Sequence, residues 1–171
     1  IAYWPLLETS GTAAVNYGTL GTDANGTYSG ATLAQIAAPD GVGSAPLFDG
    51  VNDYVDIYSG ALAVAFFNGT LGTLGTAVIR WKGYNSGVWA DGQGRQFFKV
   101  FVDANNYIAF RKTSTLNTLD FRYTAGGTQE ILTSTAYNNT AWNMMALTWT
   151  DTGDEVKWYN NDAQTGGTQT G

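Results

Sequence analysis

The strongest structural signal in this chain is the stretch Pro46-Leu47-Phe48-Asp49-Gly50-Val51-Asn52-Asp53-Tyr54-Val55-Asp56-Ile57. Its centre has the chemistry of a turn, because Gly50 can adopt a positive φ and residues 49, 52 and 53 have short side chains that bond back to their own backbone. After the turn, Val55 and Ile57 alternate with polar or tyrosine residues, as in a strand with one buried face. The stretch therefore predicts a hairpin in which residues 47–48 pair with residues 54–57.

Similar alternation recurs along most of the chain. It predicts strands at residues 2–6, 27–29, 76–82, 96–102, 107–112, 119–124, 142–150 and 155–160. The segments between 96 and 124 form a predicted antiparallel meander, and those at 142–160 a second hairpin closed by residues 151–154. Residues 31–38 fit a helical turn, and the apolar residues 61–67 fit either a buried strand or a helical turn. At least eight strands predict an all-β fold, an antiparallel β-sandwich of two packed sheets.

Composition fits this fold and restricts the chemistry. The chain has 171 residues, 22 glycines and 14% aromatic residues, which suits one domain of short strands and tight turns. The absence of Cys and His removes disulfides, thiol nucleophiles, the commonest metal ligand and the commonest general base. A net charge of −6 with scattered basic residues argues against nucleic acid as a partner. No apolar run approaches the roughly 18 residues of a membrane span, so no membrane insertion is predicted.

Four segments resemble the landmarks of laminin-G-like domains in the concanavalin A-like lectin/glucanase superfamily: residues 2–6, 48–55, 142–149 and 156–159. The resemblance implies one domain over residues 1–171 with a concanavalin A-like jelly roll. The family usually continues through one or two more strands that close the sheet beside the first strand. We therefore expect the closing strands to be missing, either because the chain is truncated or incompletely defined, or because a homo-oligomer or another neighbouring chain completes an open edge beside Trp4.

Catalysis is not expected. A glycosidase needs two carboxylates across the scissile bond, which the related glucanases place in a Glu-x-Asp-x-Glu run. The chain contains only Glu8, Glu130 and Glu155, and none lies in such a run. Asp120 alternates with Arg122 and predicts a surface ion pair instead. The sequence therefore predicts a protein that is not an enzyme.

Calcium is the one metal that the sequence keeps as an alternative, because it accepts carboxylate and carbonyl oxygens. The candidate ligands are Asp49, Asn52, Asp53 and Asp56 around the first turn, and Asp151 with Asp154 near the C-terminus. The same residue types stabilise turns through their own backbone, and we favour that interpretation. No cofactor is therefore predicted.

Trp89 is the best candidate for a sugar-binding platform. It lies in a polar, glycine-rich loop between strands, where a tryptophan has no core to fill, although it could also cover a sheet edge. The other candidates come from the same loop and from the polar face of the following strand. The predicted ligand-binding residues are Tyr84, Asn85, Trp89, Asp91, Arg95, Tyr107 and Arg111.

The resemblance implies a non-catalytic recognition module. Its expected partner is a glycan, and its expected location is extracellular, at a cell surface or on a virion surface. The alternative is a structural or adhesive domain that binds a surface protein, as a module of a bacterial surface protein or as a virion decoration or fibre component.

Overall fold

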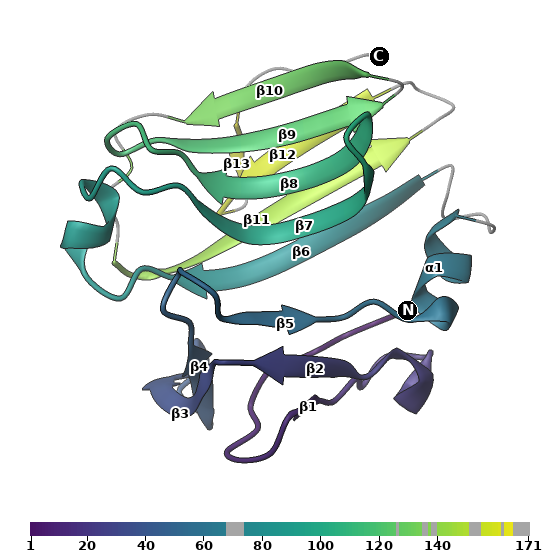
Figure 1. Cartoon of the computed structure of the whole chain (residues 1–171), viewed down its shortest axis with the longest axis vertical. Coiled ribbons are helices and arrows are strands. Elements are labelled where there is room, and N and C mark those ends of the chain that lie inside the picture. Colours follow the sequence, from purple (N-terminus) through teal and green to yellow (C-terminus); the bar gives the residue numbers. More distant parts are fainter. Residues whose placement is uncertain are drawn as a thin grey trace. The chain divides into compact units, whose positions relative to one another are not determined.

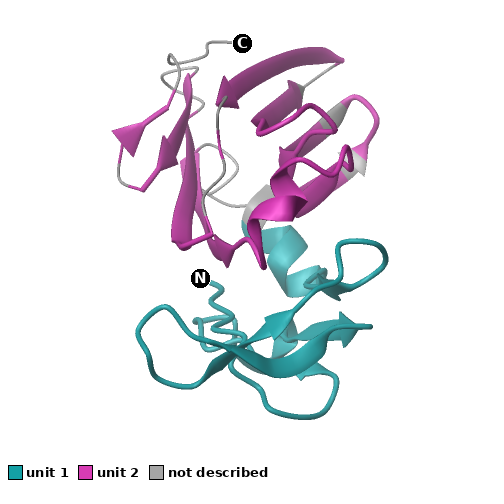
Figure 2. Ribbon diagram, turned by 90° about the vertical axis from the view of Figure 1, so that its left-hand side faces the viewer, with its two compact units in different colours: residues 1–72 teal, residues 73–171 magenta. Residues whose placement is uncertain are grey.

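The computed structural model of the chain describes residues 1–67, 74–125, 127–134, 137, 140–150, 155–161 and 163–165. The chain divides into two compact units, residues 1–72 and residues 73–171 (Figure 2). Among the described residues, no helix is long and apolar enough to span a membrane. The single laminin-G-like domain over residues 1–171 stays a prediction.

Unit 1 contains a three-stranded antiparallel sheet in the order β1-β2-β5 and a separate two-stranded ladder, β3-β4 (Figure 1). Its elements are β1 (Ala13–Ala14), the 3-10 helix η1 (Gly21–Ala24), β2 (Gly26–Ser29), β3 (Thr32–Ala37), β4 (Ser44–Leu47), β5 (Tyr54–Asp56) and helix α1 (Gly60–Phe67).

The turn after β4 forms as predicted, but the hairpin does not. The Asp49 carboxylate accepts the backbone N–H groups of Val51 at 2.7 Å and Asn52 at 3.2 Å, and Gly50 has a φ of 75°. The predicted alternation along β5 is confirmed, since Val55 is partly buried and residues 54 and 56 are exposed. However, β4 pairs with β3, and β5 pairs with β2. The turn reverses the chain without joining its two strands because each strand has another partner.

Three further predictions in unit 1 have different outcomes in the structure. Residues 31–38 contain strand β3 and no helical turn, with a register shift where Ala34 adopts a φ of 57°. Residues 61–67 take the helical alternative and belong to α1. The predicted strand at residues 2–6 is wrong: Tyr3 is held by Asn16 and Tyr17, Pro5 has no N–H to donate, and Leu6 leaves extended backbone at a φ of 55°. No strand at residues 2–6 therefore carries the predicted open edge, and residues 166–171 lie outside the described chain.

Unit 2 consists of two four-stranded antiparallel sheets, in the orders β10-β9-β8-β7 and β13-β12-β11-β6. Its elements are β6 (Leu74–Lys82), the 3-10 helix η2 (Ser86–Trp89), β7 (Arg95–Asp103), β8 (Asn106–Lys112), β9 (Leu119–Ala125), β10 (Thr128–Ser134), β11 (Trp142–Thr150), β12 (Glu155–Asn160) and β13 (Ala163–Gln164). The predicted meander is confirmed as β7-β8-β9, and the second hairpin as β11-β12, whose connection at 151–154 is outside the described residues. Strand β10 was not predicted.

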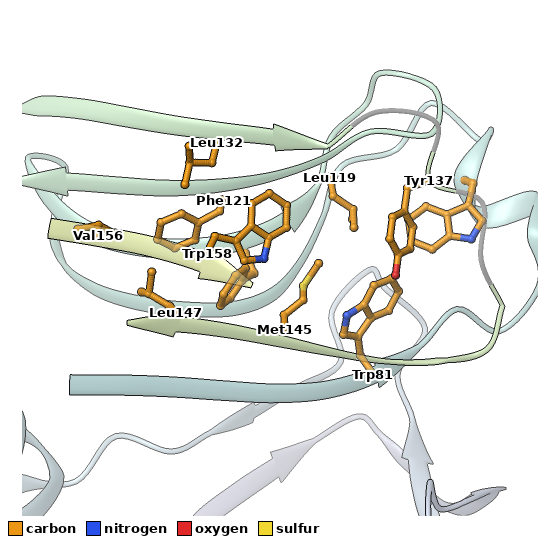
Figure 3. Close-up of a cluster of buried hydrophobic side chains, with 11 residues drawn as sticks. Trp81, Leu119, Phe121, Leu132, Tyr137, Met145, Leu147, Val156 and Trp158 are labelled. Carbon is orange, nitrogen blue, oxygen red and sulfur yellow. The ribbon is translucent and has the colours of Figure 1, made fainter. Parts of the chain in front are cut away.

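The core of unit 2 lies between these two sheets. Figure 3 shows Phe121 and Leu132 of one sheet pointing toward Leu147 and Trp158 of the other. The rings of Phe121 and Trp158 have centroids 6.3 Å apart, and both residues are almost fully buried. Burying each such side chain contributes about 1.5–3 kcal/mol. The predicted antiparallel β-sandwich is thus confirmed in unit 2, while the jelly-roll connectivity stays a prediction.

Candidate functional site

Trp89 is not available to a ligand. Its side chain is only 1% exposed, and its ring lies 5.4 Å from that of Trp81 and 5.0 Å from that of Tyr137, centroid to centroid. Helix η2 turns the loop so that the indole packs at one end of the sandwich core, where burial of a large ring is favourable. The prediction that this tryptophan has no core to fill was wrong, and its ring cannot stack on a sugar.

Two other predicted residues of this loop hold it to the sheet. The Asp91 carboxylate accepts a hydrogen bond from Nζ of Lys112 at 3.0 Å, forms an ion pair with Arg95 and accepts the N–H of Gln93 at 2.9 Å. The Lys112 side chain is 1% exposed and also donates to the carbonyls of Gln93 and Thr113. Burial raises the pKa of Asp91, but the Gln93 N–H and the cations Lys112 and Arg95 outweigh it and lower the pKa to about 2. Asp91 and Arg95 therefore have structural partners.

The other two predicted residues before Trp89, Tyr84 and Asn85, have different environments. Asn85 caps η2, because its side-chain oxygen accepts the N–H of Gly87 at 2.9 Å. Tyr84 is 66% exposed. The structure therefore does not bring the loop candidates together as a ligand-binding group.

The remaining two candidates, Tyr107 and Arg111, lie together on the outer face of the β7–β10 sheet. Phe110 and Phe121 point into the core, so their strand neighbours Arg111 and Arg122 point the opposite way. Cross-strand pairing extends this face over four strands. We use the name arginine face for the following residues of this surface: Lys99, Phe101, Tyr107, Arg111, Asp120, Arg122, Thr124 and Gln129.

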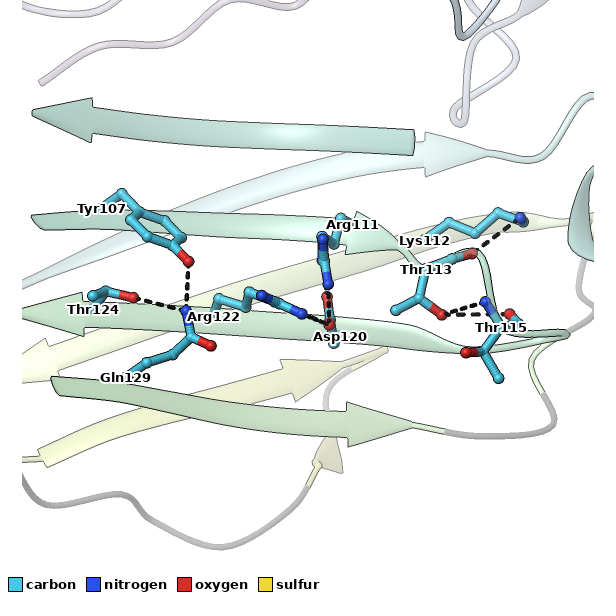
Figure 4. A network of polar contacts seen from close by, with 9 residues as sticks. All are labelled: Tyr107, Arg111, Lys112, Thr113, Thr115, Asp120, Arg122, Thr124 and Gln129. Atoms are coloured by element: carbon cyan, nitrogen blue, oxygen red, sulfur yellow. Dashed lines mark hydrogen bonds and ion pairs between the residues drawn. The ribbon is translucent and has the colours of Figure 1, made fainter. Parts of the chain in front are cut away.

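A buried carboxylate holds two guanidinium groups at the centre of the arginine face. Arg111 donates from Nε to Oδ1 of Asp120 at 2.7 Å and from Nη2 to Oδ2 at 3.0 Å, and Arg122 donates from Nε and Nη2 to Oδ2 at 3.1 Å (Figure 4). The Asp120 side chain is 5% exposed, against 30% for Arg111 and 24% for Arg122. The predicted ion pair between Asp120 and Arg122 is confirmed, but its carboxylate is buried and shared with Arg111. This sharing raises the pKa of Arg111.

Tyr107 borders this pair of arginines. Its hydroxyl accepts a hydrogen bond from Nε2 of Gln129, which also lies 3.3 Å from Oγ1 of Thr124 (Figure 4). Hydrogen bonds from Thr124 and Arg122 lower the pKa of Tyr107, and the positive charges of Arg122 and Arg111 act in the same direction. The hydroxyl therefore lies in a region of positive potential.

An exposed aromatic ring adjoins Tyr107. Phe101 is 55% exposed, and its ring centroid lies 6.4 Å from that of Tyr107. Nζ of Lys99 lies 4.0 Å from the Phe101 centroid, within the range of a cation–π contact. Sequence analysis missed Lys99 and Phe101, although their alternation along β7 is the signal that could have identified them.

Comparison with protein-family models, curated proteins and solved structures finds no match to this chain. The laminin-G-like resemblance therefore stays a prediction from the quoted sequence segments.

The arrangement of the arginine face is suited to binding. The Asp120 oxygens accept four N–H groups, so this carboxylate orients the arginines. Strands β8 and β9 fix the backbone beneath Tyr107, Arg111, Asp120 and Arg122, which limits the entropy lost when a ligand binds. The face thus combines aromatic surface with preoriented hydrogen-bond donors.

The candidate calcium ligands of unit 1 make backbone hydrogen bonds. Oδ1 of Asp49 accepts two N–H groups, Oδ2 of Asp53 accepts the N–H of Asp49, and Oδ1 of Asp56 accepts the N–H of Tyr58. Among the residues that the structure describes, no three acidic side chains converge on a position for a metal ion. Asp151 and Asp154 lie outside the described residues.

Proposed function

We propose that this chain is a non-catalytic recognition module that binds carbohydrate on the arginine face. One observation carries the proposal: exposed aromatic surface lies beside donors already held in place by a buried carboxylate. Sugars offer C–H groups to an aromatic ring and hydroxyl groups to polar side chains, so a site for them needs both. Phe101 and Tyr107 supply the first, and Arg111 and Arg122 the second.

The proposed role is binding and not turnover. Asp120, the acidic side chain at the centre of the arginine face, is engaged by two arginines, and Glu155 is paired with Lys157. Both carboxylates thus have structural partners. Because polymeric glycans lie mainly outside the cytoplasm, the proposal carries with it an extracellular or surface-displayed location.

A glycan screen with the whole chain tests this function. The wild type should bind at least one glycan, and Phe101→Ala should weaken that binding about fivefold, since an aromatic contact contributes about 1 kcal/mol. Tyr84→Ala is the matched control, because it removes a similarly exposed ring from outside the arginine face. Circular dichroism should show that both variants stay folded.

Two results would count against the proposal. If no glycan binds to the wild type over a broad screen, carbohydrate recognition is refuted. If glycans bind but Phe101→Ala and Tyr84→Ala behave alike, the arginine face is not the site. Self-association or capture of a surface protein without glycan binding would favour the structural or adhesive alternative.

A further inference from the structure

We infer that the ligand of the arginine face bears a carboxylate, as uronic sugars do. This inference rests on the proposed function and adds the chemical class of the ligand. It follows from the charge of the face and from the geometry of its two guanidinium groups.

Basic residues are confined to one part of the chain. All eight Lys and Arg residues lie in residues 73–171, the span of unit 2. Residues 1–72 contain no basic side chain and six acidic ones, which are Glu8, Asp23, Asp40, Asp49, Asp53 and Asp56. A positively charged surface in this acidic protein must therefore come from unit 2.

The arginine face is such a surface. Lys99, Arg111 and Arg122 contribute three positive charges and Asp120 one negative charge, so the named face has a net charge of +2. The nearby Asp103 follows a register shift at the end of β7, where its Oδ1 accepts the N–H of Asn105; when its negative charge is included, the net charge is still +1. The single negative charge of the Asp120 carboxylate thus neutralises only one of the two positive charges of the guanidinium groups that it positions.

The positioned arginines retain donors for a second anion. A guanidinium has five N–H donors, and each of these arginines directs two of them at Asp120. Arg122 also hydrogen-bonds to the Tyr107 hydroxyl, which engages a further donor. The remaining donors project from side chains that are 30% and 24% exposed. A planar carboxylate matches this fork and makes stronger, charge-assisted hydrogen bonds than a hydroxyl group does.

The test compares two polymers with the same sugar backbone, one with carboxylate groups and one with neutral methyl ester groups. Polygalacturonic acid carries a carboxylate on every sugar, and its methyl ester carries none. By calorimetry at low salt, the whole chain should bind the acid at least about tenfold more tightly than the ester, because charge-assisted bonds are the stronger ones. Raising the salt to about 0.5 M should weaken binding of the acid, since exposed charges are screened.

Variants locate the effect on the arginine face. Arg122→Gln should weaken binding of polygalacturonic acid about tenfold, while Arg111 still pairs with Asp120 and keeps the sheet intact. Arg80→Gln, which removes an exposed arginine from the other sheet, should leave binding unchanged. Lys99→Gln gives a second variant on the face, where Nζ of Lys99 contacts the Phe101 and Tyr107 rings, and it should also weaken binding of the acid.

The outcomes separate this inference from the proposed function. Equal binding of acid and ester would overturn the inference that the ligand bears a carboxylate, but it would be consistent with carbohydrate binding. If neither polymer binds but a neutral glycan binds in the screen, the inference of a carboxylate ligand is overturned and the proposed function is not. Equal binding of dextran sulfate and polygalacturonic acid, unaffected by Arg122→Gln, shows general attraction of polyanions and overturns the inference. No glycan binding of any kind refutes the proposed function itself.

Discussion

Replacing Trp89 with alanine tests the placement of this side chain in the core. Truncating a buried tryptophan costs about 3–5 kcal/mol, through lost burial and the cavity left behind. The Trp89 side chain is 1% exposed and packs on the rings of Trp81 and Tyr137, which lie at the end of the sandwich core and leave few side chains able to fill the space. We therefore expect the upper part of this range.

Urea unfolding followed by circular dichroism measures the effect. With a slope of about 2 kcal/mol per molar urea, the expected loss lowers the midpoint by about 2–2.5 M. Trp89→Phe should lose less, because a smaller aromatic ring still fills part of the site. Tyr84→Ala, in the same connection but 66% exposed, should change the free energy of unfolding by less than about 0.5 kcal/mol.

A Trp89→Ala variant that unfolds at the same urea concentration as Tyr84→Ala would refute the buried placement. If that variant also lost glycan binding while keeping its stability, the exposed sugar platform expected from the sequence would be right after all. A Trp89→Ala variant that is clearly less stable than Tyr84→Ala would support the core position of Trp89.

Two more predictions concern backbone geometry and pH. Gly30 has a φ of 76°, and a Cβ there would displace the Asp53 carboxylate, whose Oδ2 accepts the N–H of Asp49. Gly30→Ala should therefore cost about 1 kcal/mol more than Gly41→Ala, which has a φ of 74° and no atom within 4 Å. Equal midpoints in urea would show that Asp53 does not pack there. The pKa of Asp91 is about 2 in the folded chain, below its ordinary value of 3.8, so its contribution is complete above about pH 4 and is lost as pH falls toward 2. Thermal melts between pH 5 and 2 should therefore converge with those of Asp91→Asn, and parallel curves would contradict the ion pair.

Alternation predicted the strands well because it depends on nearby residues only. Trp81 falls on the apolar face of a strand pattern, alongside Ile79, and both contribute to the core. Trp89 lies in a one-turn 3-10 helix, where no period of two links it to a buried face. Its burial depends on contacts with Trp81 of the preceding strand and with Tyr137, which is distant in sequence, so the composition of the loop alone pointed to the wrong environment.

Pairing between strands was predicted less well than the strands themselves. The turn chemistry at Asp49 is local and forms, but the partner of β5 is β2, whose register pairs Thr27 with Asp56. Likewise, Asp120 and Arg122 lie two residues apart and could be paired from the sequence. The bond between Asp120 and Arg111 depends on the alignment of β8 with β9, which alternation does not specify.

The confinement of basic residues to residues 73–171 affects how this protein can be handled. Trypsin has no cleavage site before Arg80, so tryptic digests report on unit 2 and leave residues 1–80 as a single long peptide. Reaction of lysine side chains with amine-reactive reagents has the same asymmetry, because the four lysines are Lys82, Lys99, Lys112 and Lys157. Lys112 is shielded by burial, whereas Lys99 lies on the arginine face. Coupling the chain to a sensor through its amines would therefore modify the proposed binding surface, and attachment through a terminal tag would avoid this. Conversely, protection of Lys99 from acetylation would provide a direct footprint of a bound ligand.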